Sequence, residues 1–223
     1  MVKFAVTAGL TSAGCEVLNL GICPVPTIQF MVRRLKADGG IAITASHNPA
    51  EWNALKFIRS DGCFLNFYQA RELLDIYHQG DYIKVAADKI KDPKTIDKAV
   101  SYHADAILKK IGKLEGKKKP KVVVDCVNGA GAVMSIDFLK SLGCDVIGLH
   151  TAPVVISHAR QATAEKFGKL CETVRKTGAD IGFAQDADAD RLAVVDEKGS
   201  PIGEDYTLAL AVDYILRREK GTV

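Results

Sequence analysis

The chain has 223 residues, which is enough for one large or two ordinary domains that each bury a hydrophobic core. Its formal net charge of +3 is too small to argue for a nucleic-acid partner or an anionic membrane surface. Its apolar runs are shorter than the roughly twenty residues of a membrane helix, so we expect no membrane anchor. Its six cysteines form no CxxC pair, so we expect a cytoplasmic protein without a zinc site or disulfide framework.

The first part of the chain alternates helical and extended patterns. The elements expected there are a helix over 3–14, a strand over 16–20, a helix over 27–37, a buried parallel strand over 41–44, a hairpin of 55–59 and 63–65 around Asp61-Gly62, and a helix over 68–78. A mixed, polar segment over 79–96 follows.

The second part repeats this alternation after a lysine-rich linker at 113–121. A helix over 97–112 is expected before the linker; after it come a strand over 121–126, a helix over 130–142, a strand over 145–149, a helix over 164–177, strands over 180–184 and 192–196, and a helix over 205–219. Alternating strands and helices predict two consecutive α/β/α layered domains with mainly parallel sheets, at residues 1–96 and 97–223.

Three aspartates, Asp186, Asp188 and Asp190, alternate with alanine directly after an apolar strand. If the strand continues in an extended conformation, residues i, i+2 and i+4 point to the same side. Like charges repel unless a cation lies among them, and Mg²⁺ is a hard cation that prefers oxygen ligands. Strand ends are also where open α/β sheets bind ligands. The pattern therefore favours a Mg²⁺ site, and a solvated acidic turn is the alternative.

A second polar segment, TASHNP at 44–49, follows the strand over 41–44 and places Ser46 near the end of that strand. It has no GxSxG elbow, and His47 would point away from Ser46 in an extended segment, so neither a hydrolase nucleophile nor a Ser–His dyad is favoured. A capping role for the loop is the alternative to chemistry. Lys56, taken alone, is typical of a lysine that faces solvent.

The sequence NGAG at 128–131 follows a predicted strand, as a dinucleotide-binding turn would. Met134 stands at the third glycine position of that fingerprint, and the next strand ends without the acid that binds ribose. The pattern therefore predicts a tight turn between strand and helix, and does not favour NAD.

Taken together, TASHNP at 44–49, NALK at 53–56 and DADADR at 186–191 resemble the α-D-phosphohexomutase superfamily, which contains phosphoglucomutase, phosphomannomutase and phosphoglucosamine mutase. Segments at 8–10, 14–17 and 24–27 are similar to its first domain, and 124–131 is similar to its second. The resemblance covers essentially the whole chain.

This resemblance implies that Ser46 carries a phosphoryl group, which it gives to a glucose, mannose or glucosamine phosphate to form a 1,6-bisphosphate. The phosphoserine would hold Mg²⁺ together with Asp186, Asp188 and Asp190. These ligands would support an isomerase that interconverts hexose 1-phosphate and 6-phosphate.

The resemblance also assigns further catalytic residues. Lys56 matches the position of the general base, and its pKa must then fall below the usual value of about 10.4. Arg191 would be a cationic partner of the phosphoserine, and His47 belongs to the serine motif.

The chain also departs from the family pattern. Alanine stands at 187, where members usually have glycine, and 154–164 lacks the usual Pro- and Glu-rich pattern. Members normally have four domains, and this chain corresponds to domain II and a domain I without its N-terminal strands. We therefore expect weak or no turnover from the chain alone, and as partner either a homo-oligomer or a chain that supplies domains III and IV. Two alternatives stay open: a non-catalytic remnant that binds Mg²⁺ or phosphosugar, and a Mg²⁺-dependent phosphatase with an aspartyl nucleophile.

Overall fold

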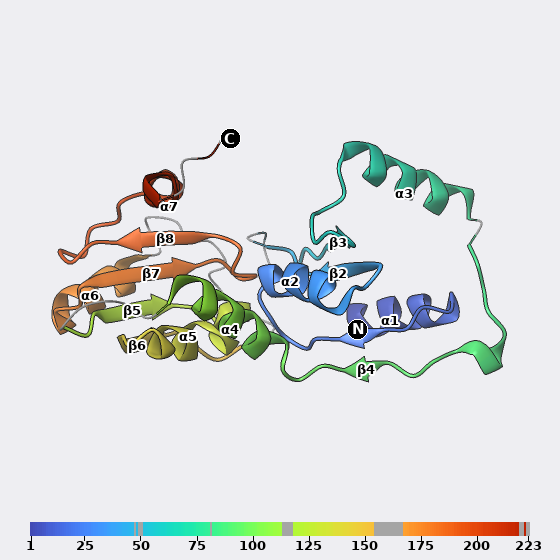
Figure 1. Ribbon diagram of the computed structural model, residues 1–223, viewed down its shortest axis with the longest axis horizontal. Coiled ribbons are helices and arrows are strands. Elements are labelled where there is room, and N and C mark those ends of the chain that lie inside the picture. Colours follow the sequence, from blue (N-terminus) through green and yellow to red (C-terminus); the bar gives the residue numbers. More distant parts are fainter. Residues whose placement is uncertain are drawn as a thin grey trace. The chain divides into compact units, whose positions relative to one another are not determined.

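The chain forms two compact units, each with its own strands and helices (Figure 1). The computed structural model describes residues 1–46, 48, 51–80, 82–112, 118–153, 167–218 and 221. The first unit comprises Met1–Ala45 and Asn53–His103, and the second comprises Ser46–Trp52 and Ala104–Val223. Within the described residues, no helix combines the length and the apolar character needed to cross a bilayer.

The first unit is built from short strands and longer helices. Its elements are α1 (Val2–Ser12), β1 (Leu18–Asn19), α2 (Val25–Leu35), β2 (Gly39–Ile43), β3 (Leu55–Arg59), α3 (Phe67–Gln79), η1 (Ala87–Lys89), β4 (Lys94–Thr95) and the start of α4 (Ala99–Ile111). β1 pairs with β4 in parallel, whereas β2 pairs with β3 antiparallel.

The prediction that β2 is a parallel strand is therefore wrong, because β2 pairs antiparallel with β3. Parallel neighbours need a crossover connection, usually a helix, whereas antiparallel neighbours need only a loop. No helix is found in the described residues between β2 and β3, and the backbone N–H of Thr44 donates to the carbonyl of Ala54 (3.0 Å). The chain thus returns directly alongside the strand it has just left.

Packing of α2 onto β2 and β3 forms the core of the first unit. Val25 and Val32 of the helix meet Ala42 and Ile58 of the strands, and all four side chains are buried. The predicted hairpin after β3 is confirmed by the antiparallel bridge between Ile58 and Phe64. The hydrophobic stripe on α2 therefore positions the two strands that lead into and out of the connection at 44–54.

The second unit contains a larger sheet with the strand order β6-β5-β7-β8. Its elements are the rest of α4, β5 (Lys121–Asp125), η2 (Ala130–Val133), α5 (Ser135–Ser141), β6 (Asp145–Leu149), α6 (Gly168–Thr177), β7 (Ile181–Gln185), β8 (Leu192–Val195) and α7 (Glu204–Arg218). β5 pairs in parallel with β6 and β7, and β8 is antiparallel to β7. These pairings confirm the expected α/β class with mainly parallel strands.

Helices cover both faces of this sheet. Val123 packs with Leu170 and Val174 of α6 in a buried cluster. On the opposite face, a Cβ added to Gly148 would lie 2.7 Å from Ile136 Cδ1 of α5, which shows how closely that helix approaches. Burial on both faces explains why the middle of β5 is continuously apolar instead of alternating.

The expected helix over 130–142 is divided into η2 and α5, because Met134 leaves the helical conformation at φ −130°. Several other expectations fall outside the described residues: most of the lysine-rich linker (113–117), the atypical stretch at 154–164 and the first residues of the helix expected over 164–177.

Candidate functional site

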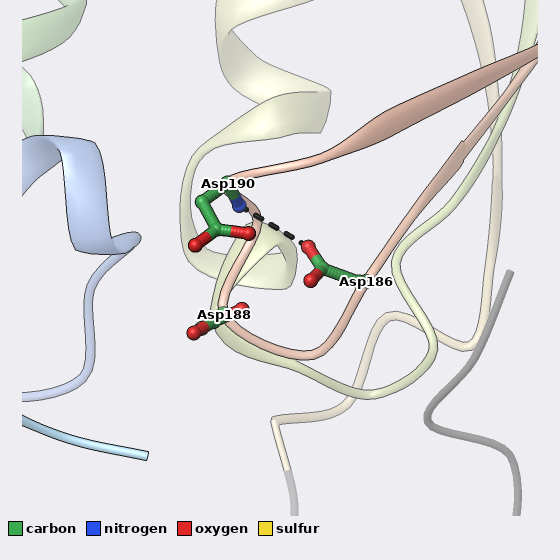
Figure 2. A group of neighbouring side chains, drawn as sticks. All are labelled: Asp186, Asp188 and Asp190. Atoms are coloured by element: carbon green, nitrogen blue, oxygen red, sulfur yellow. Dashed lines mark hydrogen bonds between the residues drawn. The ribbon is translucent and has the colours of Figure 1, made fainter. Parts of the chain in front are cut away.

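The three aspartates lie on a tight turn between β7 and β8, and not on an extended strand as predicted. Ala189 adopts a left-handed φ of 54°, and its backbone N–H donates to the carbonyl of Asp186 (3.1 Å). The turn nevertheless brings the carboxylates together, since one ligand oxygen from each of Asp186, Asp188 and Asp190 lies within 4.8 Å of the others. Figure 2 shows the Asp186 carboxylate directed at the backbone of Asp190.

Asp186 closes this turn with its own side chain. Its Oδ1 accepts hydrogen bonds from the backbone N–H groups of Asp190 and Arg191 (both 3.1 Å), and its Oδ2 accepts one from Arg191 Nε (3.1 Å). Asp186 and Asp188 are only 2% and 3% exposed. Burial raises the pKa of Asp186 to about 6, and the neighbouring charges of Asp188 and Asp190 act in the same direction.

These residues fit a hard divalent cation. Their carboxylates carry three negative charges when ionised, and Arg191 places one positive charge against Asp186. The raised pKa of Asp186 shows that the group as it stands disfavours full ionisation. A divalent cation would reverse that preference, and carboxylate oxygens are the ligands that Mg²⁺ takes in proteins. The donor set therefore suits Mg²⁺.

Ser46 follows β2 and adopts a left-handed φ of 50°. That conformation is uncommon for a residue other than glycine, and strained backbone often marks functional positions. Ser46 groups with the second unit, where Arg191 Nη2 donates to Ser46 Oγ at 3.3 Å. Arg191 therefore contacts both Ser46 and the first aspartate of the turn.

The other two predicted catalytic residues are placed differently. Lys56 belongs to the first unit, on β3 opposite Ala42, and its Nζ lies 5.8 Å from the centre of the Phe64 ring. His47 lies outside the described residues.

Residues that the sequence reasoning missed lie beside the aspartate turn. Asp125 ends β5 and is buried, and His150 Nδ1 lies 2.9 Å from its carboxylate. Asp125 pairs with Ala184 of the adjacent parallel strand, two residues before Asp186. A carboxylate at the end of one parallel strand, next to a strand that ends in aspartates, is the signal that could have identified it. Gln185 Oε1 accepts a hydrogen bond from Ser135 Oγ (2.7 Å), which local sequence patterns do not reveal.

Two family models match the sequence. "Phosphoglucomutase/phosphomannomutase, alpha/beta/alpha domain I" matches residues 1–84, and the corresponding domain II model matches residues 101–199. Together the two matches cover most of the chain.

Individual relatives agree with these matches. A phosphoglucomutase/phosphomannomutase from Thermococcus kodakarensis is 36% identical over 99% of this chain and 49% of its own length. A protein named "Probable phosphoglucosamine mutase" from Methanothermobacter thermautotrophicus is 37% identical over 94% of this chain and 46% of its own. A crystal structure of a phosphoglucomutase/phosphomannomutase family protein from Burkholderia thailandensis superposes with a TM-score of 0.83 at 28% identity, covering 96% of this chain and 47% of that one. The chain thus spans about half the length of the curated relatives it matches.

Proposed function

The chain belongs to the phosphoglucomutase/phosphomannomutase family, and from this premise we propose that it carries the phosphoserine and the metal ligands of a phosphohexomutase. The reaction would interconvert a hexose 1-phosphate and a hexose 6-phosphate through a 1,6-bisphosphate. We place the two domains at residues 1–96 and 97–223. The convergence of Asp186, Asp188 and Asp190 carries the proposal, because a phosphoryl-transfer centre needs such a cation site and the fold alone does not provide one.

In this proposal Asp186, Asp188 and Asp190 would hold Mg²⁺ together with a phosphoryl oxygen on Ser46. The cation, when bound, neutralises charge on the phosphoryl group. Arg191 contributes a second positive charge, since its guanidinium contacts both Ser46 Oγ and Asp186. Positioning and charge neutralisation of this kind account for most of the catalysis of phosphoryl transfer.

The transfer step exchanges one bond to phosphorus for another. The bond from Ser46 Oγ to phosphorus breaks as a bond from a sugar hydroxyl oxygen to phosphorus forms. The proton of that hydroxyl passes to Nζ of Lys56, which must be neutral to accept it. In the return step, a bond from Ser46 Oγ to the other phosphorus of the bisphosphate forms as the bond from that phosphorus to its sugar oxygen breaks. Nζ of Lys56 then gives its proton to the released sugar oxygen, which restores the sugar hydroxyl and the neutral lysine. We also include His47 among the proposed catalytic residues, and the reason is that it lies next to Ser46 in the TASHNP motif.

We further propose that the 223 residues by themselves turn over weakly. They span about half the length of their relatives, and orientation of reactants supplies about 7–11 kcal/mol in favourable cases. Partners would be a glucose, mannose or glucosamine phosphate, and a further chain or second copy that completes the sugar site. A reducing cytoplasm suits the six free cysteines.

The experiment that tests this proposal measures intact mass after incubation with glucose 1,6-bisphosphate and Mg²⁺. We expect a mass increase of about 80 Da that peptide mapping assigns to Ser46. Ser46→Ala should abolish the increase. Ser141→Ala should retain it, because that exposed hydroxyl donates to the backbone carbonyl of Asp137 in its own helix.

Other results would support the alternatives. A wild-type chain that stays unmodified would contradict the phosphoserine role and favour a non-catalytic remnant. Phosphate release that survives Ser46→Ala but is lost in Asp186→Asn would favour a phosphatase with an aspartyl nucleophile.

A further inference from the structure

The turn at residues 126–131, which we call the glycine turn, lies directly against the aspartate turn at 186–191. The backbone N–H of Ala130 donates to the carbonyl of Ala187 (2.8 Å), between the first and second proposed metal ligands. Just after the glycine turn, Ser135 Oγ donates to Oε1 of Gln185 (2.7 Å), the residue immediately before Asp186. The aspartate turn is therefore contacted on both sides of its first ligand.

The glycines of this turn are needed for close approach. A Cβ at Gly129 would lie 2.8 Å from Cα of Ala187 and nearer still to its carbonyl oxygen. The φ of Gly129 is −91°, which any residue can adopt, so space and not backbone angle requires glycine here. A Cβ at Gly131 would instead lie 2.9 Å from Cδ of Gln185, at the end of a flexible side chain that can move, so the requirement for glycine is strongest at Gly129.

The glycine turn is itself held in an unusual conformation. Val127 and Asn128 have left-handed φ values of 45° and 54°, and such an angle is rare for a β-branched residue. The buried carboxylate of Asp125 accepts the Val127 N–H (2.9 Å) and contacts His150 Nδ1, while the Asn128 N–H donates to the His150 carbonyl (2.7 Å). Strained backbone persists where its surroundings over-determine it, and it clusters at functional sites.

We propose that the glycine turn is a positioning element for the metal ligands, holding Asp186 and Asp188 in the geometry that a divalent cation requires. This inference rests on the proposed function, because it assumes that the aspartates bind metal. Outer contacts orient the ligands of a metal site, and their loss typically costs about 10–100-fold in metal affinity. Gly129, Ser135 and Gln185 act through the ligands, and they are positioning residues.

The test measures binding of Mn²⁺, a paramagnetic cation with similar oxygen preference, by electron paramagnetic resonance. Gly129→Ala and Ser135→Ala should each weaken Mn²⁺ binding by about 10–100-fold. Ser135→Thr, which keeps the hydroxyl, should restore most of the affinity.

Matched controls come from the same unit. Gly168→Ala adds a methyl group with no neighbour within 4 Å among the residues that the structure describes. Ser141→Ala removes an exposed hydroxyl that donates to the backbone of its own helix. Both variants should bind Mn²⁺ as the wild type does. Thermal melting without metal is recorded for every variant, because a merely structural role would lower the melting temperature without changing affinity measured well below it.

The outcomes separate the two proposals. If the wild type binds Mn²⁺, and Gly129→Ala and Ser135→Ala bind it equally well, the positioning role is wrong while the metal site stands. If the wild type itself does not bind Mn²⁺, the metal site of the proposed function fails and the positioning role fails with it.

Discussion

Both segments that carry the proposed chemistry connect antiparallel strands, yet they are built differently. The connection at 186–191 is short, and Asp186 closes it by accepting hydrogen bonds from Asp190 and Arg191 of the same turn. The connection at 44–54 between β2 and β3 is longer, and the hydrogen bond from Thr44 to Ala54 spans its base. The metal ligands are thus fixed by their own turn and its neighbours, whereas Ser46 lies near the start of a longer connection.

The supports of the two connections differ as well. The aspartate turn extends from a sheet that helices cover on both faces, and the glycine turn packs against it. The serine connection extends from a pair of strands packed on α2. We therefore expect the aspartate turn to hold its ligands close together before a cation binds, and the serine connection to depend on a separate core.

The first test asks whether each connection depends on its own core. Leu170→Ala in the second unit and Met31→Ala in the first remove fully buried side chains, and each should lower the free energy of unfolding by about 2–5 kcal/mol. Native-state hydrogen exchange should show faster opening of β5 and β7 in Leu170→Ala, and of β2 and β3 in Met31→Ala. Equal acceleration in both units by either variant would contradict separate cores.

The second test removes one metal ligand. Loss of a residue that only orients the ligands is expected to weaken Mn²⁺ binding by about 10–100-fold. Asp188→Asn removes a ligand itself and should weaken binding further. It should also raise the melting temperature without metal, because the charge of Asp188 disfavours ionisation of Asp186. Asp213→Asn, on the exposed face of α7, is the matched control and should leave Mn²⁺ affinity unchanged. A ligand variant that retains full affinity would show that the aspartates do not hold the cation.

The third test removes the positively charged side chain of Arg191, which contacts Asp186 in the aspartate turn. Arg191→Ala leaves the buried Asp186 carboxylate without its charged side-chain donor, which should cost about 1–3 kcal/mol in urea unfolding with chelator present. Arg217→Ala breaks an exposed pair within α7 and should cost about 0.5 kcal/mol or less. If the two variants unfold alike, the turn does not depend on Arg191.

The fourth and smallest effect concerns the first unit alone. His103 stacks on Phe30 and bonds to the hydroxyl of Thr27, and burial lowers its pKa below the ordinary value. The neutral form is favoured by folding, so its contribution to stability is complete above the unfolded pKa of about 6.5 and is lost as pH falls through the folded pKa. The urea midpoint should therefore decrease on acidification, and His103→Asn should flatten that slope. An unchanged slope in His103→Asn would assign the pH dependence to other groups.

Local signals in the sequence predicted much of the fold. Apolar periodicity located α2, α4 and α7 to within a few residues, and the Asp61-Gly62 pair located the hairpin after β3. The identity of the metal ligands also followed from local sequence, because Asp186, Asp188 and Asp190 stand together in the chain. The resemblance to a known family then linked Ser46 and the three aspartates in one hypothesis of phosphoryl transfer.

Tertiary structure decided what these signals left open. The antiparallel pairing of β2 with β3 depends on which strand the chain meets after its loop, and the period-two pattern is the same for either direction. The aspartates converge on a turn closed by Asp186, which a strand pattern cannot distinguish from an extended continuation. The contact of Gly129 with Ala187 joins residues that are remote in sequence. The sequence by itself therefore determined which groups are present, and only the tertiary structure decided how they meet, because strand pairing and backbone approach are set by non-local contacts.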